Sequence, residues 1–198
     1  MRPSERRFLH STVAAYGSQL ARVAIRAAGD LLLARLLLPH DHGLFDLALG
    51  IVLVGTILRD LGLPYQLVRD DRRPYGAVLL WVTGAGAVIA AILALAAPLF
   101  SSLDPGLPPV LRVYALFVLL DGLSVVPKIY FERELAVGRL VLPEVARGLA
   151  MAGVSVALAF GGFGVWSLVA GQLAGAALFA ALLWWRAWGR MPLALDAA

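Results

Sequence analysis

The stretch that decides the fold is STVAAYGSQLARVAIRAAGDLLLARLLL, residues Ser11–Leu38, a long apolar run that also carries charges. On a helix, where each residue advances by about 100°, its polar residues gather within a sector of roughly 140°. They are Ser11, Ser18, Gln19, Arg22, Arg26 and Asp30. A charge at the centre of a bilayer costs about 2.5–3.5 kcal/mol on insertion scales. We therefore expect the other helices to enclose this polar side, and we expect it to contact the substrate.

The composition of the whole chain indicates a membrane protein. Of its 198 residues, 61% are hydrophobic, whereas soluble domains average about 45–50% apolar residues. Apolar runs of about 20 residues recur along the chain, as membrane-spanning helices require, and leave no room for a soluble domain. The sequence thus predicts an all-α, polytopic membrane protein, since barrel strands would be only about 10 residues long.

We expect one transmembrane domain over 1–198, with six spans at about 12–38, 44–68, 76–100, 110–127, 143–160 and 165–185. If the N-terminus is cytoplasmic, the outer loops contain no Lys or Arg, and most of the 17 basic residues lie in cytoplasmic segments. These are Arg2, Arg6, Arg7, Arg69, Arg72, Arg73, Lys128, Arg133, Arg139, Arg186 and Arg190. This asymmetry predicts that both termini are cytoplasmic. It also explains the net charge of +4 without a nucleic-acid partner.

Local signals refine the ends of these spans. Pro39 is expected to end the first span and Asp41 to cap the next helix. The segment 128–142 has the mixture of charged and aromatic residues of an amphipathic interfacial piece, and Pro143 is expected to open the fifth span. Gly171 and Gly175 form a GxxxG pattern, which is typical of close helix packing. The tryptophans near predicted interfaces fit an aromatic belt; they are Trp81, Trp184, Trp185 and Trp188.

Three segments resemble a known family. They are LARLLLPHDHGLFDLALG (33–50), DLGLPYQLV (60–68) and GGFGVWSLVAGQLAG (161–175). In order and spacing they are similar to the polysaccharide-biosynthesis, or O-antigen, flippases of the superfamily that includes MATE transporters. His42 departs from that pattern, because an aromatic residue is usual there. Members of the family have twelve to fourteen spans in two six-helix lobes, so six spans would correspond to the N-terminal lobe.

The resemblance implies a function. It implies that the protein translocates an oligosaccharide linked to a polyprenyl diphosphate across the cell inner membrane, in contact with membrane lipids. It also implies a second six-helix lobe, from the same or another chain. Two other classes stay open: a drug or small-molecule exporter of the same superfamily, and a membrane enzyme or scaffold in polyprenyl-phosphate glycan metabolism.

A flippase must shelter a diphosphate, and guanidinium groups pair well with phosphate oxygens. Arg22 and Arg26 are the best candidates on the first span, with Gln19 beside them. The alternative is that Arg26 and Asp30 form an ion pair at i and i+4, while Arg22 extends to the interface. Asp121 is expected to pair with an arginine of the first span, or else to couple transport to an ion.

The remaining charged and polar residues of the spans have simpler expected roles. Arg59 is expected to extend to the interface, away from its neighbour Asp60, and Glu144 and Arg147 to lie at the interface. Gln172 either lines the cavity or ties two helices together.

No catalytic centre or cofactor is predicted. The chain has no Cys, which removes thiol nucleophiles and thiolate metal sites. His40, Asp41 and His42 could suggest a metal, but without further ligands a loop that leads into a helix is the better interpretation. No nucleotide-binding motif appears. We therefore expect no enzyme activity, no cofactor and no metal site.

Overall fold

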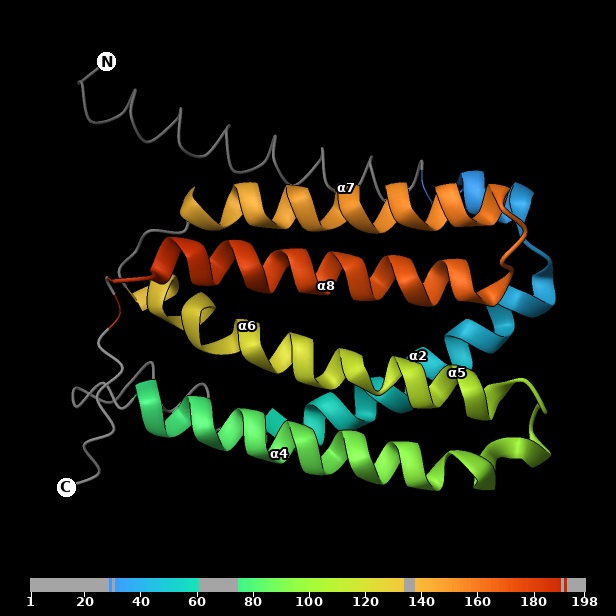
Figure 1. Ribbon diagram of the computed structural model, residues 1–198, viewed down its shortest axis with the longest axis horizontal. Coiled ribbons are helices and arrows are strands. Elements are labelled where there is room, and N and C mark those ends of the chain that lie inside the picture. The colour runs from blue at the N-terminus through green and yellow to red at the C-terminus, as the bar shows by residue number, and fades with distance from the viewer. Residues whose placement is uncertain (1–28, 30, 61–74, 134–137, 190, 192–198) are drawn as a thin grey trace, which may run out of the picture.

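The computed structural model describes residues 29, 31–60, 75–133, 138–189 and 191, which form helices joined by short connections (Figure 1). A helical stretch at 31–36 is followed by α2 (Pro39–Asp60), α4 (Tyr75–Ala96), the 3₁₀ helix η1 (Ala97–Ser102), α5 (Leu107–Tyr114), α6 (Leu116–Arg133), α7 (Gly138–Phe160) and α8 (Val165–Ala187). These described residues include no β-strand, which confirms the all-α prediction for this part of the chain.

Five stretches of the described chain are long and apolar enough to cross a membrane. They are Pro39–Asp60, Tyr75–Ser102, Leu107–Arg133, Gly138–Phe160 and Val165–Ala187. The chain is therefore a multi-pass membrane protein, as its composition predicts. The five stretches match the second to sixth predicted spans in order. The first predicted span lies mostly outside the described residues, and the orientation of the spans stays a prediction.

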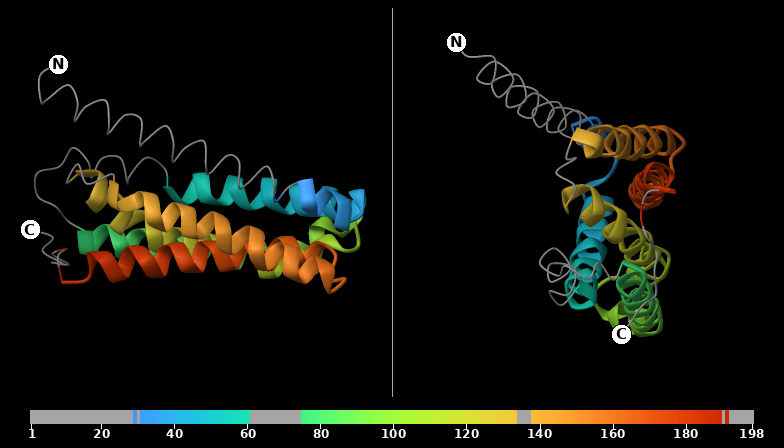
Figure 2. Two further views of the ribbon diagram at one scale, coloured as in Figure 1. Left: turned by 90° about the horizontal axis from the view of Figure 1, so that it is seen from above. Right: turned by 90° about the vertical axis from the view of Figure 1, so that its left-hand side faces the viewer.

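The long helices form a layered bundle. In Figure 1, α7, α8, α6 and α4 lie side by side, and α8 separates α7 from most of α6. Helix α2 packs on α4 and α5, behind this layer, as the end-on view of Figure 2 shows. Small and branched apolar residues fill the interior, among them Val52, Val82 and Val118. Large apolar residues such as Leu95 and Leu99 are exposed, as expected of side chains that face lipid.

Two prolines lie inside helices, and this corrects two predictions. The segment 128–142 is not a simple loop, because α6 continues to Arg133 and α7 begins at Gly138, whereas its interfacial position stays a prediction. Pro143 therefore lies in the interior of α7 and does not open it, and Pro127 lies inside α6. A proline has no N–H to offer the carbonyl four residues earlier. Membrane helices tolerate this where a neighbouring group satisfies that carbonyl.

Helix α8 supplies a donor to both carbonyls. The Trp184 indole Nε1 donates to the Leu123 carbonyl oxygen at 2.8 Å, four residues before Pro127. The Arg186 guanidinium Nη1 donates to the Arg139 carbonyl oxygen at 2.6 Å, four residues before Pro143. Both helices can therefore run through their prolines because the end of α8 lies between them.

The GxxxG pattern of α8 lies against α7. A Cβ atom added at Gly171 would overlap the Ser155 hydroxyl and lie 2.6 Å from the Met151 carbonyl oxygen. A Cβ atom at Gly175 would lie 3.0 Å from the Arg147 carbonyl oxygen. The two glycines thus allow the α7 and α8 backbones to approach closely, as the sequence predicts.

Candidate functional site

Most of the predicted substrate-binding residues cannot be placed. Gln19, Arg22, Arg26 and Asp30 lie outside the described residues, and their role stays a prediction. Asp121 lies in the first turns of α6, with 26% of its side chain exposed. Its carboxylate Oδ2 accepts a hydrogen bond of 3.0 Å from Nη2 of Arg59, near the end of α2. In the described part of the chain the partner of Asp121 is thus an arginine of the second span, and the expected pairing with an arginine of the first span stays a prediction.

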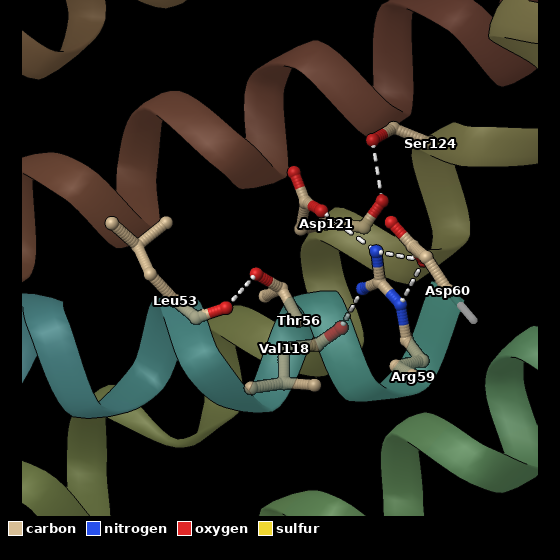
Figure 3. A network of polar contacts seen from close by, with 7 residues as sticks. All are labelled: Leu53, Thr56, Arg59, Asp60, Val118, Asp121 and Ser124. Atoms are coloured by element: carbon tan, nitrogen blue, oxygen red, sulfur yellow. Dashed lines mark hydrogen bonds and ion pairs between the residues drawn. The ribbon is translucent and has the colours of Figure 1, made fainter. Parts of the chain in front are cut away.

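Arg59 is the centre of a polar network between α2 and α6 (Figure 3). Its Nε donates to Asp60 Oδ1 at 2.8 Å, and its Nη1 donates to the Val118 carbonyl oxygen at 2.7 Å. With Asp121 at Nη2, every nitrogen of the guanidinium has an acceptor. The network is extended by Ser124, whose hydroxyl donates to the Asp121 carbonyl oxygen at 2.6 Å.

The prediction that Arg59 extends to the interface is wrong, because the residue is only 1% exposed. Two glycines leave room for its side chain. A Cβ atom at Gly86 of α4 would lie 3.4 Å from Arg59 Cδ, and one at Gly122 of α6 would lie 3.2 Å from Nη1. Asp60 does not point away from Arg59 but binds it. Three helices therefore hold this arginine inside the bundle.

The charges of this network do not cancel when both acids are ionised. One guanidinium faces two carboxylates, and those of Asp60 and Asp121 keep 36% and 26% of their side-chain surface exposed. The buried arginine already has two carboxylates and a carbonyl oxygen as acceptors. The network of Arg59, Asp60 and Asp121 joins α2 to α6 and leaves its two acids partly accessible. We call these three residues the clamp between α2 and α6.

A second cation, Arg147, lies further along its helix than predicted. Since α7 begins at Gly138, Arg147 is more than two turns inside the helix and does not lie in its first turn. Its guanidinium carbon lies 5.3 Å from the centre of the Phe179 ring and 5.9 Å from that of Phe117. The interfacial position expected for Arg147 stays a prediction, although the side chain is turned toward aromatic rings of α6 and α8.

The polar residues near the start of α2 are joined to other elements. His40 Nε2 lies 2.7 Å from Asp104 Oδ2, and the other Asp104 oxygen accepts from the Gly106 amide at 2.7 Å. The Gly106 amide, together with His40, lowers the pKa of Asp104 below its ordinary value of 3.8. No group of three or more potential metal ligands occurs among the described residues.

Asp41 does not cap α2 as expected, because the helix already begins at Pro39 and places Asp41 in its first turn. Its carboxylate instead faces Gly164, the residue before α8, within 3.2 Å of where a Cβ atom would lie. Gly164 has a φ of 54°, which favours glycine. The segments 33–50 and 161–175 thus meet at this turn.

The fold and these networks define an all-helical, multi-pass membrane protein with charged residues inside its bundle. A family model described as "Polysaccharide biosynthesis protein" matches residues 32–197. The chain therefore belongs to the polysaccharide biosynthesis protein family and is a membrane protein of polysaccharide biosynthesis. Searches among curated proteins and among solved structures found no match.

Sequence reasoning did not find the Arg59 network. Arg59 lies near the end of an apolar segment, where an arginine usually reaches the interface. The only local signals are the glycines of α4 and α6, Gly86 and Gly122, and their contact with Arg59 depends on how three helices pack.

Proposed function

We propose that the protein translocates an oligosaccharide carried on a polyprenyl diphosphate across the cell inner membrane. The observation that carries this proposal is the match of the polysaccharide biosynthesis family to residues 32–197 of a chain with at least five membrane-crossing helices. A product assembled on a lipid carrier on one side of a membrane must cross it before use on the other side. A bundle with charged residues inside suits such a polar cargo.

In this proposal the protein moves its substrate without chemistry and without a cofactor. Two six-helix lobes, the second from the same or another chain, enclose a cavity and open it first to one side of the membrane and then to the other. The first span lines the cavity with Arg22, Arg26, Asp30 and Gln19. Asp121, fixed to Arg59, lies on the partly accessible side of the clamp between α2 and α6.

The proposal is tested by complementation in a strain that lacks its own flippase. The chain is expressed alone and together with a candidate second lobe, and surface polysaccharide is measured. Restored polysaccharide in either case supports translocation. Absence of polysaccharide in both cases, with the protein present in the membrane, would contradict the proposal.

The cavity lining is tested with Arg22→Ala plus Arg26→Ala in the same strain. We expect this double variant to lose surface polysaccharide. The matched control is Arg112→Ala, which changes an exposed arginine of α5 and is expected to have no effect. If the double variant works as well as the unchanged chain, the two arginines are structural.

A further inference from the structure

We propose that Arg139 and Arg186 form a binding site for the headgroup of an anionic phospholipid. The site lies where the first turn of α7 meets the last turn of α8. These two helices lie side by side, and the start of α7 and the end of α8 are at the left in Figure 1. The ligand is a lipid of the surrounding membrane, so this proposal does not depend on the translocation of an oligosaccharide.

The first observation is that the two arginines meet at one point. Nη1 of Arg186 donates to the carbonyl oxygen of Arg139 at 2.6 Å. This bond fixes one corner of a guanidinium, whose five N–H groups form a rigid fork. The side chain of Arg139 starts from the same residue that the fork binds, and it is exposed. Two positively charged side chains therefore emerge close together at the surface of the bundle.

The second observation is that these charges are not neutralised within the part of the chain that the structure describes. There, no carboxylate forms an ion pair with Arg139 or Arg186. Lys128 of α6, by contrast, has the carboxylate of Glu132 at 3.9 Å. Two neighbouring cations repel each other, and an anion bound between them removes this repulsion. A phosphate suits this place, because its oxygens accept paired hydrogen bonds from a guanidinium.

The third observation is that the surroundings of the arginines are those of a lipid. Trp185 and Trp188 are 74% and 80% exposed, and indole rings favour the headgroup level of a membrane. On α7, Leu142 and Leu149 are 57% and 54% exposed. At about 100° per residue, both leucines lie within roughly 80° of Arg139 around the helix. An exposed stripe of α7 thus begins with a cation and continues with apolar residues, in the order of a headgroup and an acyl chain.

These surroundings favour a phospholipid over a soluble anion. A free phosphate would contact only the two guanidinium groups, whereas a phospholipid also covers the exposed leucines and indoles with its glycerol and acyl groups. Basic groups between membrane helices can bind anionic headgroups in this way on the cytoplasmic side of a membrane. The orientation predicted from the distribution of Lys and Arg places this end of the bundle on that side.

The experiment measures which lipid contacts this end of the bundle. The full chain is reconstituted into phosphatidylcholine vesicles at about 0.15 M salt, where exposed charges more than about 8 Å apart are screened. Brominated phosphatidylglycerol or brominated phosphatidylcholine is included at the same mole fraction, and quenching of tryptophan fluorescence is compared. Trp81→Phe and Trp166→Phe are introduced throughout, so that the remaining tryptophans near the end of α8 report the contact; they are Trp184, Trp185 and Trp188.

In this protein we expect phosphatidylglycerol to be preferred over phosphatidylcholine by about tenfold, since each arginine near a membrane surface contributes about fivefold. Arg139→Gln removes one charge but keeps the backbone carbonyl that binds Arg186, so the fold should not change. It should lower the preference by about fivefold, and Arg139→Lys should keep most of it. The matched control is Arg112→Gln, at an exposed arginine of α5, which should keep the full preference.

Equal quenching by the two brominated lipids before any arginine is changed would overturn the proposal. A loss of preference in Arg112→Gln as large as that in Arg139→Gln would also overturn it, because the attraction would then come from net charge and not from a site. Soluble glycerol phosphate is added as a competitor. If it abolished the preference, the site would bind a free anion, and the assignment to a lipid would be wrong.

Discussion

The indole of Trp184 donates its hydrogen bond to the carbonyl oxygen of Leu123, the group that Pro127 leaves without a helical partner. The two residues are 61 positions apart in the sequence. The Arg186 guanidinium likewise donates to the Arg139 carbonyl oxygen, which Pro143 leaves without a helical partner in α7. The last two turns of α8 therefore stabilise the proline-containing segments of both neighbouring helices, which ties three helices together at one end of the bundle.

We expect Trp184→Phe to destabilise the protein by about 1–2 kcal/mol, because it leaves the Leu123 carbonyl without a donor in an apolar surrounding. In a Pro127→Ala background, α6 regains the N–H that can bond this carbonyl, so the same substitution should cost less. The free energy of unfolding in detergent checks both values.

The control for this prediction is Trp185→Phe, because Trp185 is 74% exposed and makes no such bond among the described residues. Its stability should match that of the unchanged protein. Equal losses for Trp184→Phe with and without Pro127 would show that the indole stabilises α6 by packing alone.

Helix α8 shows what the sequence could predict. Its expected range, 165–185, agrees closely with Val165–Ala187, because glycines precede it and an apolar run fills it. The GxxxG glycines also lie where the pattern indicates, against α7. These features depend on neighbouring residues in the sequence, so local rules find them.

Features that depend on distant partners could not be predicted in this way. Pro143 appears to local rules as the start of a helix, and only Arg186, 47 residues later than Arg139, lets it lie in a helix interior. Arg59 likewise faces inward because Asp121, 62 residues away, and two glycines on other helices receive it. Hydrophobic periodicity describes a single helix and carries no information about such contacts.

A second prediction concerns the contact between α7 and α8. Gly171→Ala should destabilise the protein by about 1–3 kcal/mol, because the added methyl group overlaps the Ser155 hydroxyl and crowds the Met151 carbonyl. Adding Ser155→Ala to Gly171→Ala removes the overlap with the hydroxyl and keeps the crowding of the Met151 carbonyl. The double variant should therefore recover part of the lost stability. The Ser155 hydroxyl has no partner within the described residues, so Ser155→Ala alone should be harmless. Thermal unfolding in detergent measures all three variants.

The matched control for the glycine is Gly84→Ala in α4. No atom of the described structure lies within 4 Å of the Cβ that this change would add. Its stability should stay unchanged or rise slightly, since alanine favours helix. If Gly84→Ala and Gly171→Ala behaved alike, close approach of α7 and α8 would not be the reason for Gly171.

A third prediction concerns acid stability at the end of the bundle that contains Asp104. Because the pKa of Asp104 is lowered from 3.8 in the folded protein, its ionised carboxylate makes its full contribution to folding stability above that pH. The contribution is lost as the pH falls below 3.8 through the folded pKa. Thermal stability of the unchanged protein should thus decrease in this range more steeply than that of Asp104→Asn, which cannot titrate.

The same experiment separates the effect of His40 on the pKa of Asp104 from that of the Gly106 amide. His40→Gln removes the ring that lies 2.7 Å from Asp104 but keeps the Gly106 amide, which is the larger cause of the lowered pKa. Its acid profile should lie between those of the unchanged protein and Asp104→Asn. A His40→Gln profile as flat as that of Asp104→Asn would show that the amide contributes nothing.

The last prediction concerns the clamp between α2 and α6, through a double-mutant cycle. Asp121→Ala should cost about 1.5–3 kcal/mol in the unchanged protein, the range for hydrogen bonds to charged groups, because Arg59 is buried and loses one of its two carboxylates. In an Arg59→Met background the same change should cost little, since Met fills the space without a charge. The free energy of unfolding of the four proteins gives the coupling between the two residues. Asp46→Ala, at an exposed acid of α2, is the control and should show no coupling to Arg59. Additive losses for Arg59 and Asp121 would mean that Asp60 and the Val118 carbonyl hold the guanidinium without Asp121, and that the 3.0 Å contact does not join the two helices energetically.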